Sequence, residues 1–191
     1  MRYHSTKKGY SLIEVLIAVA ILMLSIVGPM TIAVKSTQSA QYARQQNTAF
    51  FLAQEGISIV NTLRNNAGLG KYIGGEADAW TWIDNAALAP CKASSGCNID
   101  FINPSLLSHV TSCAVLADCT LYFSPDIANR AAYQSKVKLG EASPYRRIIT
   151  LAQSPSNPDE IMVTSRVEWE TNVLKGTKVV TLSTSLFNMF K

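Results

Sequence analysis

Hydrophobic residues are most concentrated near the start of this 191-residue chain, in one long run without a charged side chain. Residues 15–34 are uncharged and mostly apolar, and Glu14 and Lys35 flank them. A helix of about 20 apolar residues is long enough to span a bilayer. A secretory signal peptide has a shorter apolar core, closed by a small-residue cleavage site, and no such site closes this run. The pattern therefore predicts a membrane-spanning helix.

Beyond Lys35 the pattern becomes amphipathic. The recurring apolar positions are Phe50, Ala53, Ile57 and Val60. Their steps of three and four residues are typical of one buried helix face. We therefore expect a single helix from about Leu12 to about Arg64, with its first half in the membrane and its second half on a soluble sheet. Residues 65–68, Asn-Asn-Ala-Gly, are expected to end it.

The C-terminal part alternates between apolar and polar residues, which predicts half-buried strands. On the segment 161–170, one face holds Ile161, Val163, Val167 and Trp169, and the other holds Thr164, Arg166, Glu168 and Glu170. Residues 146–151 alternate in the same way. Lys175-Gly176 is a turn signal, and the returning strand 178–186 completes a hairpin. The fold class expected is α+β, with a long N-terminal helix packed on a C-terminal antiparallel sheet.

Between helix and hairpin lies a region rich in glycine, alanine, serine and asparagine, with turn signals at Gly74-Gly75, Pro90, Ser94-Ser95-Gly96 and Pro104. Its aromatic residues are expected to cover the helix or the sheet edge. They are Trp80, Trp82, Phe101, Tyr122, Phe123 and Tyr133. The predicted segments are 1–9 (leader), 10–34 (transmembrane half of the helix), 35–66 (amphipathic half), 67–144 (variable, disulfide-containing region) and 145–191 (C-terminal antiparallel strands).

The residues around the start of the apolar run form a motif. Lys8-Gly9-Tyr10-Ser11-Leu12-Ile13-Glu14 and the apolar helix after it resemble the class III leader of type IV pilins and pseudopilins. The resemblance implies cleavage between Gly9 and Tyr10 by a prepilin peptidase, N-methylation of Tyr10 and a pilin-like fold. The family usually has phenylalanine where this chain has Tyr10. Glycine suits the cleavage site physically, because it lets a peptidase hold the backbone extended.

Glu14 is a costly residue at the edge of a membrane segment, and such residues usually mark a function. The resemblance implies that it pairs with the N-terminal amine of Tyr10 or of a neighbouring subunit. A position at the headgroup level, where a carboxylate suits the positive end of the helix dipole, is the alternative. Gly28-Pro29 interrupts the run, and proline removes a helix hydrogen bond, so we expect either a static kink or the partly melted segment found in many pilins.

Four cysteines, Cys91, Cys97, Cys113 and Cys119, lie outside the helix in two pairs of equal spacing. An even count beyond a membrane favours disulfides, for which three connectivities are possible. Pairing Cys91 with Cys97 and Cys113 with Cys119 is the simplest. A zinc site is the alternative, although the spacing is longer than that of usual ligand pairs. We therefore expect no metal and no cofactor.

Charge adds little to this picture. The formal net charge is +4, but Arg2, Lys7 and Lys8 belong to the predicted leader, and the remainder is close to neutral. These basic residues place the leader in the cytoplasm by the positive-inside rule. Bulk charge gives no support for nucleic-acid binding. A modest basic group with nearby aromatics keeps a DNA patch as a weaker alternative to paired surface charges. Its members are Lys136, Lys138, Arg146, Arg147, Tyr133 and Tyr145.

No catalytic constellation is visible. His4 falls in the predicted leader, and His109 has no companion of the kind that a triad or paired-histidine metal motif requires. The acidic residues Asp100, Asp118 and Asp126 do not form a tight calcium loop, so they are expected to be solvated surface residues. The sequence thus predicts a protein that is not an enzyme.

The function expected is that of a structural filament subunit, most similar to a minor type IV pilin. Its C-terminal residues 167–169 and 179–188 also resemble minor pilins. Partners would be the prepilin peptidase and other pilin subunits. The location would be the inner membrane, with one span and the C-terminal domain outside, followed by the pilus or pseudopilus. The alternatives are a type II secretion pseudopilin, an extracellular binding module anchored by one helix, and an anchored enzyme.

Overall fold

The computed structural model describes residue 9 and residues 11–74, 79–100, 110–124, 132–134, 141–171 and 176–189. It contains one long helix, α1 (Leu12–Gly74), and a short helix, α2 (Ala89–Lys92). The strands are β1 (Cys97–Ile99), β2 (Val110–Ser112), β3 (Thr120–Ser124), β4 (Ala132–Gln134), β5 (Glu141–Gln153), β6 (Glu160–Glu170) and β7 (Thr177–Phe187). Short 3-10 helices cover Ala79–Asp84, Ala86–Leu88 and Leu116–Cys119. By its contacts the chain divides into two compact units, Met1–Ala43 and Arg44–Lys191.

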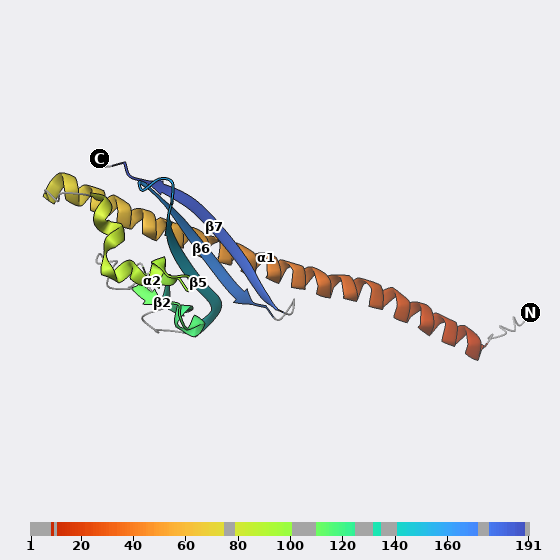
Figure 1. The fold of residues 1–191 in the computed structure, drawn as a ribbon. Helices are drawn as coiled ribbons and strands as arrows, with labels where there is room; N and C mark the ends of the chain where they lie inside the picture. The colour runs from red at the N-terminus through yellow and green to blue at the C-terminus, as the bar shows by residue number, and fades with distance from the viewer. Residues whose placement is uncertain are drawn as a thin grey trace, which may run out of the picture. The chain divides into compact units, whose positions relative to one another are not determined.

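All strand pairs of the second unit are antiparallel, and the seven strands form one sheet around β5. β6 lies along one edge of β5, and β7 follows β6. The other edge of β5 is shared, because β1 pairs near Ile149 and β3 pairs between Glu141 and Arg146. Figure 1 shows β5, β6 and β7 as the long strands of this sheet. The α+β fold class is therefore confirmed.

The sheet is larger than the sequence indicated. Four of its strands, β1 to β4, come from the middle region 67–144, which we expected to be dominated by turns. These strands are three to five residues long, too short for their alternation to stand out from a glycine- and serine-rich background. The β6–β7 hairpin, in contrast, is confirmed over its full length, with Ile161 opposite Leu186 and Val167 opposite Val180.

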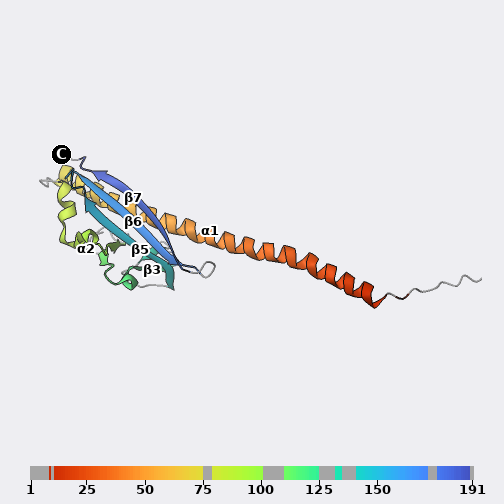
Figure 2. The ribbon, with the colours of Figure 1, turned by 45° about the vertical axis from the view of Figure 1, so that its right-hand side comes forward.

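The second half of α1 covers one face of the sheet (Figures 1 and 2). Its buried residues are Ala49, Leu52, Ala53, Gly56, Ile59, Val60, Leu63, Arg64 and Gly68. Ala53 and Val60 of the predicted face are among them, Ile57 is partly buried against the core, and Phe50 is 41% exposed. The prediction for Phe50 was wrong. The predicted face thus overlaps the buried stripe at Ala53 and Val60 without matching it, because small residues such as Ala49 and Gly56 complete the stripe.

Gly56 explains why this stripe is the one that faces the sheet. A Cβ atom at position 56 would lie 2.5 Å from Ser165 Oγ and 3.3 Å from Arg147 Cδ. The helix backbone therefore approaches β5 and β6 closely at this glycine. Close approach of backbone is a recurrent use of glycine.

The helix also continues past its predicted end, to Gly74. Asn65 accepts hydrogen bonds from Arg64 at 3.1 and 3.3 Å, and Gly68 is buried. Positive φ, which a glycine C-cap requires, occurs among the described glycines only at Gly96 and Gly176. Gly68 is thus a packing residue of the helix, and the prediction that residues 65–68 terminate α1 was wrong.

Aromatic side chains of β3, β4, β5 and β6 contact one another across the sheet. Tyr133 lies 5.1 Å from Phe123 and 6.1 Å from Tyr145, and Tyr145 lies 6.4 Å from Trp169, measured between ring centroids. Burial raises the pKa of both Tyr133 and Tyr145 above 10.0. Trp82 is buried in the core, as expected. Phe101 and the side chain of Trp80 lie outside the described residues.

Candidate functional site

The N-terminal motif leads directly into α1. The Ser11 carbonyl accepts hydrogen bonds from the backbone N–H groups of Glu14, at 3.0 Å, and of Val15, at 3.3 Å. Gly9 is exposed just before the helix. Tyr10, the residue expected to become the methylated N-terminus, lies outside the described residues, as does the rest of the predicted leader. Cleavage and methylation at this position stay predictions.

Glu14 lies in the first turn of α1 and is exposed. Four backbone N–H groups at a helix start lack partners within the helix, and the dipole places a partial positive charge there. A carboxylate in this turn is favourable by itself, and it also stands where a nearby ammonium group could pair with it. The position of Glu14 is compatible both with pairing to an N-terminal amine and with a place at the headgroup level, so its pairing remains a prediction.

The helix that follows Glu14 presents apolar side chains on every side. Its exposed large residues in the first unit include Leu16, Ile21, Leu22, Leu24, Ile26 and Ile32, each more than half exposed. In the described part of the chain, α1 is the one helix long and apolar enough to cross a membrane. Exposed apolar surface of this size requires a covering medium or partner.

Gly28 and Pro29 both lie inside the continuous α1. Pro29 has no N–H group, so the Ser25 carbonyl lacks its usual helix donor. The hydroxyls of Ser25 and Thr31 donate to the carbonyls of Leu22 and Gly28, both at 2.8 Å, which is how serine and threonine are commonly satisfied in apolar helices. The kink or partly melted segment at Gly28-Pro29 stays a prediction.

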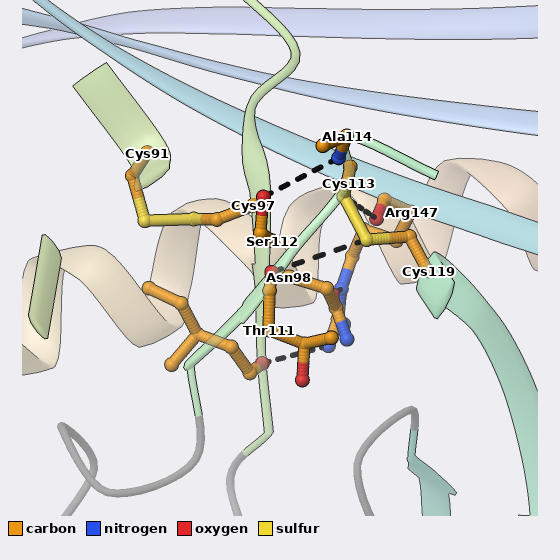
Figure 3. The surroundings of a disulfide bond; sticks show 10 residues. Cys91, Cys97, Asn98, Thr111, Ser112, Cys113, Ala114, Cys119 and Arg147 are labelled. Carbon is orange, nitrogen blue, oxygen red and sulfur yellow. Dashed lines mark hydrogen bonds between the residues drawn. A yellow bond between two sulfur atoms is a disulfide. The ribbon is translucent and has the colours of Figure 1, made fainter. Parts of the chain in front are cut away.

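The four cysteines form two disulfides, Cys91–Cys97 and Cys113–Cys119 (Figure 3). This is the simplest of the three connectivities, and no cysteine remains free. The zinc alternative is therefore excluded for these sulfurs, because a disulfide provides no thiolate ligand. Each bridge closes a short loop beside β5, one between α2 and β1 and the other around the 3-10 helix Leu116–Cys119.

Arg147 is the most unexpected residue of the second unit. It is fully buried, whereas we expected it on a basic surface patch. Its guanidinium donates to Asn98 Oδ1 at 2.7 Å, Glu55 Oε2 at 2.8 Å and the Ile99 carbonyl at 3.0 Å. Arg147 thus ties α1 and β1 to β5, and Figure 3 shows it beside Asn98.

The proposed DNA patch is consequently not assembled by the described residues. Arg147 is inside the domain, and Arg146 pairs with Glu170 at 3.1 Å on the other face of β5. Tyr145 is 5% exposed, and its hydroxyl donates to the Gln45 carbonyl. Lys136 and Lys138 lie outside the described residues. An arginine pair at successive strand positions necessarily points to opposite faces, which the sequence could have indicated.

The acidic residues also differ from expectation. Asp100 is fully buried and accepts a hydrogen bond from Asn98 Nδ2 at 2.9 Å, so the prediction that it is a solvated surface residue was wrong. Asp118 is exposed, as expected. Asp126, like His109, lies outside the described residues. Across the described parts of the chain, no group of three or more histidine, cysteine or acidic residues could hold a metal ion.

The polar network of the buried residues Asn98, Asp100 and Arg147 with the partly exposed Glu55 was missed by sequence reasoning. Its one usable signal is that Arg147 occupies the apolar register of β5, in step with Ile149 and Leu151, both buried. A charge in that register points inward and needs a buried partner. The identity of the partners could not be found in this way, because they lie 49 and 92 positions away.

In a comparison with known families, residues 4–28 match the prokaryotic N-terminal methylation motif. No curated protein and no solved structure matched the chain. The match covers Gly9, Tyr10 and Glu14 and the first part of the apolar helix, which are the residues that carry the resemblance. The chain therefore bears the N-terminal methylation motif that is the signature of type IV pilins and pseudopilins.

Proposed function

We propose that this protein is a structural subunit of a type IV pilus-like filament, in the role of a minor pilin. The observation that carries the proposal is the methylation motif placed immediately before an exposed apolar helix. The motif supplies a processing site, and the helix supplies a surface that needs both a membrane and, later, other subunits. The proposed role is structural and involves no catalytic step by this chain.

Processing would cut the bond between Gly9 and Tyr10 and leave Tyr10 as a methylated N-terminus. Before assembly the first half of α1 would hold the chain in the inner membrane as a single span. The basic residues of the leader favour the cytoplasmic side, so the second unit would lie outside. Disulfides Cys91–Cys97 and Cys113–Cys119 fit that side, because they form and persist in oxidising compartments.

Glu14 would contribute the charge pairing of assembly. When the helix leaves the membrane for a filament interior, an unpaired carboxylate is costly. The amine created by cleavage, on Tyr10 of this chain or of a neighbour, is a partner of opposite charge and compensates that cost. The exposed position of Glu14 in the first turn of α1 leaves the carboxylate accessible to such a partner.

Two other functions are supported by the same observations. A pseudopilin of a type II secretion system needs the same processing and the same helix, and differs in the machinery that assembles it. An extracellular binding module anchored by α1 needs the membrane span without processing. The folded second unit is compatible with both functions. Cleavage and methylation at the N-terminus are therefore what distinguish a filament subunit from an anchored module.

The test is to express the full chain with a prepilin peptidase and a filament assembly system, and to measure intact mass and filament content. We expect the wild type to begin at N-methylated Tyr10 and to appear in sheared filaments. Gly9→Val should keep the leader, because the side chain obstructs the extended backbone in the peptidase site. Glu14→Gln should be processed normally and yet be depleted from filaments at least tenfold.

A wild-type chain that keeps its leader beside a processed control pilin would rule out a filament subunit and leave the anchored module. A Glu14→Gln chain found in filaments at wild-type amount would disprove the charge pairing. Assembly only with secretion machinery, and never with pilus machinery, would identify a pseudopilin.

A further inference from the structure

The outer face of the sheet, opposite α1, carries a hollow of about 440 Å³. Its floor is formed by neighbouring residues of β5 and β6, Ile148 and Thr150 opposite Arg166 and Thr164. Its walls are the two disulfide-closed loops, through Ser94 and Ser95 on one side and Leu116 on the other. A hollow of this volume is in the range of small-molecule sites.

The walls are fixed to each other and to the floor. The backbone N–H of Cys113 donates to the Gly96 carbonyl at 3.0 Å, which joins the two loops. Gly96 has a φ of +69°, and a Cβ there would lie 2.6 Å from Ile148 Cγ2 and 2.9 Å from the Ile149 carbonyl. The first loop is thus pressed onto β5, and each loop is closed by its own disulfide. A site built in this way loses little conformational entropy when it binds a ligand.

The chemistry of the lining is specific. Arg166 is the one charged residue that lines the hollow, and its side chain is 49% exposed. One of its terminal nitrogens pairs with Glu168, which leaves other guanidinium N–H donors open to solvent. A guanidinium of this kind matches the geometry of a carboxylate.

Hydroxyl groups and apolar surface complete the lining. In the described structure no hydrogen bond involves the hydroxyls of Ser94, Ser95 or Thr150. Each can both donate and accept, as the hydroxyls of a sugar do. Ile148, Leu116 and the Cys113 side of its disulfide give an apolar surface, on which the C–H face of a pyranose ring can pack.

We infer that this hollow binds a carboxylated sugar, of the uronic acid class, with the carboxylate on Arg166 and ring hydroxyls on Ser94, Ser95 and Thr150. The site belongs to the second unit and does not depend on processing or assembly of the N-terminal helix. It would give the protein a ligand-binding role at the outer surface, beyond that of a filament subunit.

The experiment is a calorimetric titration of the full chain in detergent micelles with D-glucuronate, D-glucose and acetate. Glucose tests the hydroxyls without the carboxylate, and acetate tests the carboxylate without the hydroxyls. We expect saturable binding of glucuronate, with a Kd of about 1 mM typical of a single small ligand in a shallow site. Binding of the other two should be at least about tenfold weaker, as loss of a charge-assisted or several neutral hydrogen bonds implies.

Arg166→Gln should weaken glucuronate binding by about tenfold, while Arg146→Gln is the matched control and should have no effect. Arg146 lies on the same face of β5 and pairs with Glu170, but does not line the hollow. Because Glu168 loses its partner in Arg166→Gln, Thr150→Val is a second variant that keeps the shape of the side chain. It should weaken binding by about threefold through one lost hydrogen bond.

Absence of saturation at about 50 mM glucuronate, far above the expected Kd of ~1 mM, would overturn the inference. Acetate that binds as tightly as glucuronate would show an anion site without sugar recognition. Glucose that binds as tightly as glucuronate would show that Arg166 does not bind the ligand through a carboxylate. Equal effects of the Arg146 and Arg166 variants, in chains with unchanged thermal unfolding, would also contradict it.

Discussion

The two halves of α1 share one helical backbone and differ in what their side chains need. In the first half, Leu16, Leu24 and Ile32 are more than 60% exposed and belong to an apolar surface on every side of the helix. In the second half, Leu52, Ile59 and Val60 are almost completely buried. The first half thus depends on a medium outside the described chain, and the second half on the sheet of its own unit.

The difference shows that a helix can be specified in two ways. In the first half overall hydrophobicity is sufficient, and no particular face matters, because lipid surrounds a helix evenly. In the second half the specification is positional. Gly56 permits close approach, Arg147 reaches the Leu52 carbonyl and Glu55, and one wrong side chain at such points separates helix from sheet. Substitutions that disrupt the packing or the membrane insertion of one half of α1 should therefore leave the other half unaffected.

The largest effect is expected from Arg147→Ala. This change leaves Glu55 and Asn98 without their buried cationic partner and opens a cavity between α1 and β5. Asn98 Oδ1 and the Ile99 carbonyl are buried acceptors that lose their donor, and each such loss costs about 1–3 kcal/mol of unfolding free energy, to which the cavity adds. Chemical denaturation of the full chain in micelles, followed by tryptophan fluorescence, measures this loss, and the amount of membrane-inserted chain should not change.

Arg146→Ala is the control for that experiment, since it removes the neighbouring arginine from the solvent-facing pair with Glu170. A pair of this type contributes about 0–1 kcal/mol. Equal destabilisation by the two variants would contradict the role assigned to the buried network.

Leu24→Arg should have the next largest effect, on the first half only. Leu24 lies near the centre of the apolar run and is 77% exposed. An arginine at the centre of a membrane helix raises the apparent free energy of insertion by about 3 kcal/mol. A translocon insertion assay measures this change, and denaturation of the second unit should be unaffected.

Phe51→Arg is the matched substitution in the second half, because Phe51 is also exposed, at 67%. Its insertion energy should equal that of the wild type. An equal shift for Phe51→Arg would show that the membrane segment extends beyond the first half.

The smallest effect is expected from Pro29→Ala. The alanine N–H can donate to the Ser25 carbonyl and so restores one helix hydrogen bond, which contributes about 1 kcal/mol. Amide hydrogen exchange of residues 26–33 in micelles should slow several-fold, and the exchange of residues 49–63 should be unchanged. Unaltered exchange around position 29 would mean that no kink or opening exists there.

Much of the fold could be predicted because its hydrophobic patterns extend over many residues. The run at residues 15–34 and the alternation of β6 each repeat over many positions. β6 formed as expected, and so did α1 over its predicted range, although it continues to Gly74. The short strands β1 to β4 could not be predicted, because they are held by pairing with other strands and not by a pattern of their own. β1 and β3 pair with β5, β2 pairs with β1, and β4 pairs with β3.

The predicted sites differ in the same way: those formed by residues close in sequence could be predicted, and those assembled from distant segments could not. The cysteine pairing is the simplest of the three that the sequence left open, between residues close in sequence, and the methylation motif is contiguous in sequence. Arg147 was misplaced on the surface, since its partners Asn98 and Glu55 come from distant segments. Asp100 was also misplaced there, although its donor Asn98 is only two positions away. The hollow on the outer face requires both disulfide loops and two strands at once, so no single stretch of sequence could indicate it.

The contact between Arg147 and Glu55 also sets a minimum delay between synthesis of the helix and its packing on the sheet. The two residues are 92 positions apart, and a ribosome adds roughly 5–20 residues per second. After Glu55 is made, roughly 5–18 s must pass before Arg147 exists at all, and β6 and β7 follow later still. During that interval the stripe on α1 that the sheet will cover faces solvent, so a nascent chain of this protein is most vulnerable to aggregation and proteolysis just before its C-terminal strands emerge.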